Sequence, residues 1–256
     1  MDHIANGAKI YFAIKTPWFT INITQTVITI FVATVLLIIL GAVIGRNLKK
    51  RPGGFQVIVE KLVSMLYGLV ESTMGTHNLK FAPYIGTLFL SSLFCTLLGM
   101  TQILRSATAD ISVTLAWALV TTGLVWYSTI KNFGFKAWLK GFTEPIIIMT
   151  PMNIVSEIAQ PISLAFRHFG NVAGGGVLTA LIYTSLAGLT NILFGWIDDA
   201  IQYIPFLQVG IPAFLSIYFD LFSGFVQAFV FCLLTMVYVG AANPPPEEIE
   251  AAKKKK

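Results

Sequence analysis

Charge is scarce in this sequence of 256 residues, and its scarcity excludes most classes of soluble protein. Only 11% of the residues are charged, 55% are hydrophobic, and the mean hydropathy is +0.76. A soluble domain cannot cover that much apolar surface with so few charges. The composition is typical of a polytopic helical membrane protein.

Cysteine and the common cofactor motifs are also scarce. Cys95 and Cys232 fall within apolar runs, where a thiol behaves as a small hydrophobic side chain, so no disulfide framework is predicted. The sequence lacks a Gly-Lys-Ser/Thr phosphate loop and a set of Cys and His residues at the spacing of metal ligands. It also lacks a Ser, His and Asp combination in the sequence context of a catalytic triad. The run from Gly174 to Gly176 lies inside membrane sequence, which favours helix packing over nucleotide binding. We therefore expect no bound cofactor or metal.

Basic residues are confined to short loops and the carboxyl-terminal tail, with one exception. The formal net charge is +5, but this distribution indicates membrane topology and no binding of nucleic acid. Arg46, Lys49, Lys50 and Arg51 follow the first apolar run, which places that end in the cytoplasm and the amino terminus outside. Between Lys140 and Lys253 the only Lys or Arg is Arg167.

The apolar runs predict an all-α polytopic membrane protein. Two of these runs, at 81–100 and 111–130, are predicted to be spans that form a two-helix hairpin. In chain order the predicted segments are an external amino-terminal segment (1–22), the first span (23–44), a cytoplasmic basic loop with an amphipathic surface helix (45–80), a two-helix hairpin (81–130), a cytoplasmic loop (131–145), two long tilted helices (146–240) and a disordered cytoplasmic tail (241–256).

Polar residues interrupt the two long helices and form one stripe on each. On the first, Arg167, Asn171 and Gly174 are spaced i, i+4, i+7 and share a face with Gly170. On the second, the residues that share a face are Asp220, Ser223, Gly224 and Gln227. Small residues beside the charge allow another helix to come close.

A guanidinium at bilayer depth costs at least about 2.5–3.5 kcal/mol, so Arg167 requires an anionic partner or a wet cavity. Within the chain, Asp220 or Glu157 could form a structural ion pair with it. Alternatively, Arg167 meets a carboxylate on another subunit and promotes ion release from that group.

Three further polar residues have structural interpretations. Glu157 is either a packed hydrogen-bonded group or a channel wall. His168 is more consistent with a satisfied histidine than with a proton relay. Asp110 is in a position to cap the third span, since an acidic residue is favourable at a helix amino terminus.

The chain resembles the membrane-embedded a subunit of the rotary F-type ATP synthase over essentially its whole length. The resemblance rests on Pro52, on residues 56–60, on Ala109-Asp110, on Gln227-Ala228-Phe229, and above all on the block Pro161, Ser163, Leu164, Arg167, Phe169, Gly170 and Asn171.

The resemblance implies a stator subunit that is not catalytic alone and forms two offset half-channels. Protons or sodium ions would load and unload the carboxylate of a rotating c-ring that faces Arg167. Gln227 would be the polar partner of Arg167, and Asp110 the acidic residue at the outer side. The other implied residues of the ion path are Asn171, Glu157, Asp220 and Ser223, and the small residues facing the rotor are Gly170, Gly174 and Gly224.

The chain departs from the family pattern at three positions. Gly176 occupies a place where many relatives carry Glu, and Asp220 is the acid that would replace it on the other helix. His168 replaces a usual Leu, and nothing in the sequence explains this change.

The implied partners are the c-ring, the peripheral-stalk b subunits and the lipid bilayer. Residues 1–17 fit neither a signal peptide nor a transit peptide, which favours a bacterial plasma membrane. Two alternatives are a self-contained secondary transporter that binds an anionic solute through Arg167 and a purely structural membrane-assembly subunit.

Overall fold

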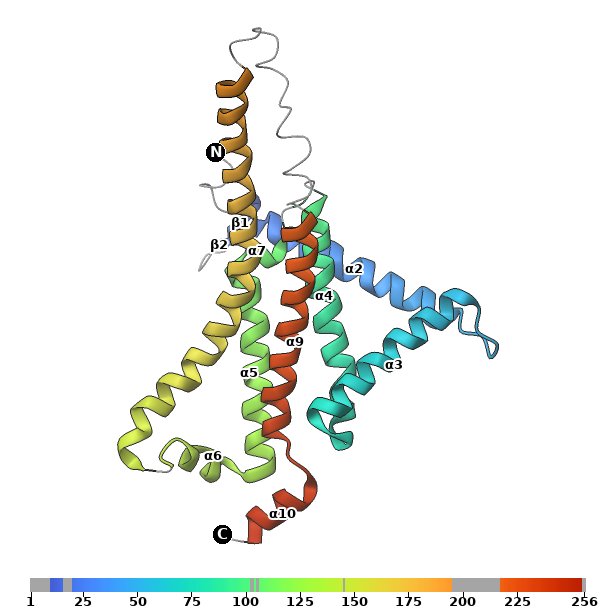
Figure 1. Ribbon diagram of the computed structural model, residues 1–256. Helices are drawn as coiled ribbons and strands as arrows, with labels where there is room; N and C mark the ends of the chain where they lie inside the picture. Colours follow the sequence, from blue (N-terminus) through green and yellow to red (C-terminus); the bar gives the residue numbers. More distant parts are fainter. Residues whose placement is uncertain are drawn as a thin grey trace. The chain divides into compact units, whose positions relative to one another are not determined.

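The structure is a computed structural model that describes residues 10–15, 20–101, 104, 106–144, 146–194 and 217–254. Within this part the chain is almost entirely helical, with one antiparallel pair of short strands (Figure 1). Five described helical segments are long and apolar enough to cross a membrane. The prediction of an all-α polytopic membrane protein is confirmed.

The elements follow one another without long internal loops in the described ranges. In chain order they are β1 (Ile10–Lys15), β2 (Thr20–Thr24), α2 (Gln25–Arg46), α3 (Gly54–Met74), the 3₁₀ turn η1 (Thr76–Phe81), α4 (Ala82–Met100), the 3₁₀ turn η2 (Ala107–Ala109), α5 (Ile111–Phe133), α6 (Phe135–Gly141), the 3₁₀ turn η3 (Ile147–Met149), α7 (Thr150–Phe194), the π-helical turn η5 (Ile217–Phe222), α9 (Ser223–Ala242) and α10 (Pro246–Lys254).

Strands β1 and β2 are a feature that the sequence did not predict. They pair antiparallel, with Ala13 opposite Asn22, in the segment expected only to precede the first span. Because β2 extends to Thr24, α2 begins at Gln25 instead of residue 23.

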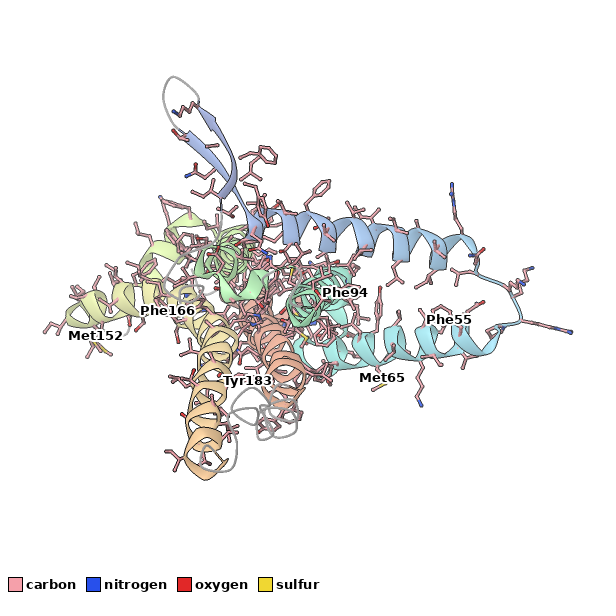
Figure 2. All side chains as sticks on the ribbon, turned by 90° about the horizontal axis from the view of Figure 1, so that it is seen from above. Phe55, Met65, Phe94, Met152, Phe166 and Tyr183 are labelled. Atoms are coloured by element: carbon pink, nitrogen blue, oxygen red, sulfur yellow. The ribbon has the colours of Figure 1, made fainter. Side chains whose placement is uncertain are left out.

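Helix α3 is amphipathic and is not among the five candidate spans. Phe55 and Met65 extend from it with 69% and 63% of their surface exposed, whereas Val70 is buried (Figure 2). The helix ends at Gly75, whose φ of 83° favours glycine, and a side chain there would also meet the ring of His77. This pattern fits a helix that lies on a surface with one face packed.

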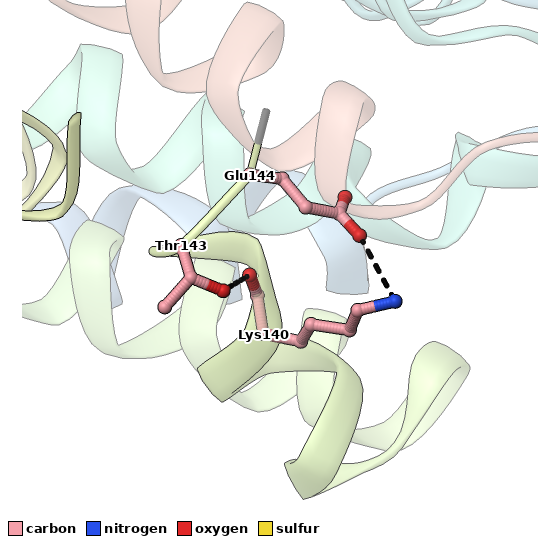
Figure 3. A network of polar contacts seen from close by, with 3 residues as sticks. All are labelled: Lys140, Thr143 and Glu144. Carbon is pink, nitrogen blue, oxygen red and sulfur yellow. Dashed lines mark hydrogen bonds and ion pairs between the residues drawn. The ribbon is translucent and has the colours of Figure 1, made fainter. Parts of the chain in front are cut away.

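Two short helices occupy segments predicted to be a loop and a disordered tail. In α6, the ring of Trp138 packs against Trp126 and Phe142 at centroid distances of 5.9 and 5.0 Å. At the end of α6 the Lys140 ammonium pairs with the Glu144 carboxylate at 3.4 Å, and the Thr143 hydroxyl donates a hydrogen bond to the Lys140 backbone carbonyl (Figure 3). The tail forms α10, whose first turn carries Glu247 and Glu248, a favourable position for acidic residues.

Helix α7 is one continuous helix of 45 residues. Pro151 occupies its first turn, where the missing backbone N–H costs no hydrogen bond. Pro161 lies inside the helix, and the helical backbone continues through it.

Backbone contacts divide the chain into two compact units, and several helices contribute to both. Unit 1 comprises Met1–Ala33, Leu93–Ile111 and Arg167–Ala228, and unit 2 comprises Thr34–Ser92, Ser112–Phe166 and Phe229–Lys256. Unit 2 contains an apolar core of buried residues from α3, α4, α5, α7 and α9. Its members are Val70, Met74, Ala82, Ile85, Leu88, Ala118, Leu164, Ala165, Phe231, Cys232, Met236 and Val239.

An amide cluster in unit 2 ends α9. Asn78 donates a hydrogen bond of 2.8 Å to the Asn243 carbonyl, and Asn132 donates one of 2.9 Å to the Ala242 carbonyl. Asn243 in turn donates to the Val239 carbonyl at 2.9 Å. The last carbonyls of a helix have no partner within it, and here side chains from other elements satisfy them.

The interior of unit 1 is more polar. Its buried side chains include several hydroxyls and two larger polar groups: Thr26, Thr29, Thr96, Thr108, His168, Thr190 and Gln227. A buried polar group is costly unless it is hydrogen-bonded, so this interior depends on specific pairing. All the sequence-predicted site residues except Glu157 fall in unit 1.

Candidate functional site

The centre of the site is one exposed face of α7, formed by Arg167, Gly170, Asn171 and Gly174 and called here the arginine face. All four residues are exposed. A Cβ atom added at Gly170 or Gly174 would meet no described atom within 4 Å. The described part of the chain therefore leaves open space beside the guanidinium.

Arg167 has no ion pair or hydrogen bond among the residues that the structure describes. Glu157 lies ten residues earlier on the same helix, about 15 Å along the axis, which is too far for a pair. The side chain of Asp220 is outside the described part, so a pair with Asp220 stays a prediction. The described residues thus supply no counter-ion.

Asn171 and Gln227 are joined by a direct hydrogen bond. The Asn171 amide nitrogen donates to Oε1 of Gln227 at 2.6 Å, which links α7 to the first turns of α9. Gln227 is 5% exposed, and its Nε2 is buried without a partner among the described residues. An unmet buried donor costs about 1–3 kcal/mol, so an acceptor is expected there.

His168 supports the same contact from the buried side of α7. Its side chain is fully buried and hydrogen-bonds with the backbone of Gln227. His168 follows Arg167 and points about 100° away from it on the helix. The hydrogen bond links α7 to α9, and the choice between a satisfied histidine and a proton relay stays a prediction.

Asp110 lies between η2 and α5 and contacts the start of α2. Its backbone is extended, with φ of −115° and ψ of 121°, immediately before the first residue of α5. The Thr26 hydroxyl donates a hydrogen bond of 2.9 Å to its Oδ2. The sequence offered no signal for Thr26, because the two residues are separated by 84 positions and hydroxyls are common near helix starts.

Glu157 lies in a different place, on the wall of a pocket in unit 2. The indole N–H of Trp126 donates to its Oε1. The cavity has a volume of about 350 Å³, and its lining consists of Trp138, Gly141, Phe142, Glu144, Asn153, Ser156 and Glu157. Asn153 holds the rim by donating to the carbonyls of Phe142 and Glu144. Glu157 is therefore a hydrogen-bonded group that also lines a cavity, and its role as a channel wall stays a prediction.

Gly224 differs from Gly170 and Gly174. It is buried, and a Cβ atom on it would lie 2.5 Å from the Thr96 methyl group of α4. The small residue is explained by close packing of α4 and α9 within unit 1, so Gly224 is not placed to face another subunit. Ser223, which begins α9, is half-buried.

The family model described as ATP synthase A chain matches residues 26–240. That match covers most of the sequence. The chain belongs to the ATP synthase a-subunit family.

Similar proteins from several bacteria, each named as an ATP synthase subunit a, agree with this assignment. The chain is 32% identical over 243 residues to a protein named ATP synthase subunit a, sodium ion specific, from Propionigenium modestum, with 89% of this chain and 77% of the relative covered. It is 32% identical over 264 residues to ATP synthase subunit a 2 of Chlorobaculum tepidum, covering 95% and 72%. It is 34% identical over 225 residues to ATP synthase subunit a of Listeria welshimeri, covering 84% and 90%.

Family membership makes the chain a multi-pass membrane component of the ATP synthase membrane sector. It decides against the alternative of a self-contained transporter for an anionic solute. The Arg-x-Phe-Gly-Asn and Gln-Ala-Phe blocks, on which the resemblance rests, contain Asn171 and Gln227, which the structure joins by a hydrogen bond in unit 1.

Proposed function

We propose that the chain is the stator ion-channel subunit of the synthase. It forms two offset half-channels that load and unload a carboxylate of the c-ring, so that flow of H⁺ or Na⁺ drives rotation and ATP synthesis. The complex resides in a bacterial plasma membrane, with the amino terminus outside and the carboxyl terminus in the cytoplasm. The peripheral-stalk b subunits hold the chain in place, and no bound cofactor is needed.

The observation that carries the proposal is the exposed Arg167 on a face lined by Gly170 and Gly174. A guanidinium keeps its charge at any physiological pH, because its pKa is above about 12. In a bilayer such a charge must meet an anion or water. Since the described residues supply no anion, a carboxylate of a neighbouring subunit is the partner that fits.

The second support is the pairing of the polar groups around Arg167. Asn171 donates to Gln227, and His168 binds the Gln227 backbone, so these groups are engaged with one another. They fix α7 against the start of α9 without neutralising the guanidinium. The positive charge of Arg167 therefore acts on an approaching carboxylate. It favours the ionised form of that group and so promotes release of the bound ion.

The two ion paths are assigned to different residues. On the outer side, Asp110, Asp220 and Ser223 pass ions towards the rotor carboxylate. On the cytoplasmic side, the polar cavity with Glu157 on its wall is the exit. Arg167 separates the paths, and a neutralised rotor carboxylate turns into lipid, where its charged form would be too costly.

The energetic scale is consistent with a rotary mechanism. One charge that crosses 100 mV supplies about 2.3 kcal/mol, so several ions are needed for each ATP. A protein that couples in this way must prevent direct leakage between the two paths. A fixed charge between them provides that barrier.

Crosslinking tests the proposed partner. A cysteine at Gly174 is expected to crosslink to the small c-ring subunit in the assembled complex, because the arginine face is open there. The native Cys95 and Cys232 are buried and leave the background low. Gly123→Cys, at an equally open position of α5, is the matched control and should not form this product. A product from Gly123 alone, or none from Gly174, contradicts the proposal.

The exit path has a separate test in the cavity of unit 2. Glu157→Gln should slow passive ion flux through the reconstituted membrane sector several-fold, because it removes a charged oxygen from the cavity wall. Glu60→Gln is the control, since Glu60 is an exposed carboxylate of α3 and is not part of the lining of this cavity. It should leave the flux unchanged. Equal flux in the wild type and Glu157→Gln would remove Glu157 from the path.

A further inference from the structure

Thr26 and Asp110 form the contact between the start of α2 and the turn before α5 in unit 1. The Thr26 side chain is 3% exposed, and its hydroxyl donates to Oδ2 of Asp110 at 2.9 Å. A hydrogen bond from a hydroxyl to a carboxylate is charge-assisted and stronger than a neutral one. A buried hydroxyl that points at a partly exposed carboxylate is well suited to fix its orientation.

The backbone that carries Asp110 is already held by a second set of hydroxyls. The Ser106 hydroxyl donates to the Cys95 carbonyl at 3.2 Å, and it also lies 2.8 Å from the Thr108 hydroxyl. Thr108 in turn lies 3.1 Å from the Thr96 hydroxyl of α4. These bonds anchor η2 to α4 next to Asp110.

Gly99 shows how closely this turn approaches α4. A Cβ atom at Gly99 would lie 2.4 Å from the Ser106 Cβ and 2.8 Å from its Cα, so only glycine allows the contact. With the backbone fixed in this way, the orientation of the Asp110 carboxylate depends on the contacts of its side chain. The hydrogen bond from Thr26 is one of these contacts.

We propose that Thr26 is a positioning residue for the outer ion path, because its hydroxyl holds the Asp110 carboxylate in the orientation that receives cations from outside. The inference rests on the proposed function and adds a residue on the first spanning helix to it. Thr26 acts through Asp110.

The same geometry serves either translocated cation. A group that passes a proton must lie within hydrogen-bonding reach of the next donor or acceptor, so a misoriented carboxylate transfers it slowly. Sodium ions are hard cations that prefer oxygen ligands, and the carboxylate and the hydroxyl are both of that kind. In both cases the loss of orientation weakens uptake from outside and leaves later steps unaffected.

The experiment measures cation influx through the complete membrane sector reconstituted in vesicles, at fixed voltage, as a function of external H⁺ in one arm and external Na⁺ in the other. Thr26→Val keeps the shape of the side chain and removes the hydroxyl. We expect it to raise the half-saturating concentration of the translocated cation about tenfold, as loss of a hydrogen bond to a charged group does, with the maximal rate unchanged.

Two variants separate orientation from packing. Thr26→Ser keeps the hydroxyl and should restore the wild-type curve. Thr29→Val is the matched control one turn along α2, where a fully buried hydroxyl bonds to the Gln25 carbonyl of its own helix. It should leave the half-saturating concentration unchanged. A Thr26→Val curve that superimposes on the wild type, or an equal shift in Thr29→Val, overturns the proposal.

Asp110→Asn distinguishes failure of this inference from failure of the proposed function. If Asp110→Asn slows influx and Thr26→Val does not, only the role of Thr26 is overturned. If the wild-type sector shows no saturable influx in either arm, the proposed function itself is overturned.

Discussion

Arg167→Ala should abolish coupled ATP synthesis and make the membrane sector leaky. Without the guanidinium, an emptied rotor carboxylate loses its attraction to the stator, and the two ion paths lose the charge that separates them. The expected readouts are synthesis at the background level under an imposed ion gradient, and increased passive flux through vesicles that contain the sector without its catalytic head. The effect is the largest expected for any single substitution in the chain.

The neighbouring Phe166 provides the matched control. It is 54% exposed and adjacent to Arg167, but it carries no charge, so Phe166→Ala should retain synthesis. Arg167→Lys keeps the charge without the planar donor geometry and should retain only part of the activity. Normal synthesis by an assembled Arg167→Ala complex would end the proposal. The same result is what a purely structural assembly subunit would give.

Gly174→Leu should inactivate the complex without unfolding the chain. Among the residues that the structure describes, the Cβ position at Gly174 meets nothing within 4 Å, so the thermal stability of the purified protein should be unchanged. A leucine on the arginine face would nevertheless project into the space that a passing rotor needs. ATP synthesis and ATP-driven ion pumping should both fall to background.

Gly224→Leu should also inactivate the complex, but through loss of stability of the chain. Its side chain would collide with Thr96 inside unit 1, so it should lower the melting temperature of the chain itself. Gly123→Leu on α5 should affect neither stability nor synthesis. If Gly174→Leu remains active, or loses activity only together with stability, the arginine face is not the rotor contact.

The helices were largely predictable because hydropathy over about twenty residues is a strong signal. Helices α4 and α5 begin within a residue or so of their predicted starts. The exceptions have local causes. The pairing of β1 and β2 delays the start of α2, and the packing of Trp138 among Trp126 and Phe142 stabilises α6 in a segment that reads as a basic loop.

The site was only partly predictable from the sequence. Helical spacing correctly groups Arg167 with Asn171 and Gly174, because residues on one face are determined by one helix alone. Contacts between helices are not determined in this way. They depend on which helices pack together, and no periodicity within one helix encodes that choice. Examples are the hydrogen bonds from Thr26 to Asp110 and from Trp126 to Glu157, and the close packing of Thr96 against Gly224.

The length of α7 has a geometric consequence for how a rotor would meet it. Along its contour the helix measures about 68 Å, more than twice the hydrocarbon thickness of about 30 Å, so α7 fits within that layer only with the strong tilt that the sequence predicts. Arg167 and Gly174, about 10 Å apart along the helix, then succeed one another laterally more than vertically. A carboxylate carried past at constant depth would pass the glycine and the charge in sequence, so their order along α7 distinguishes the two directions of travel.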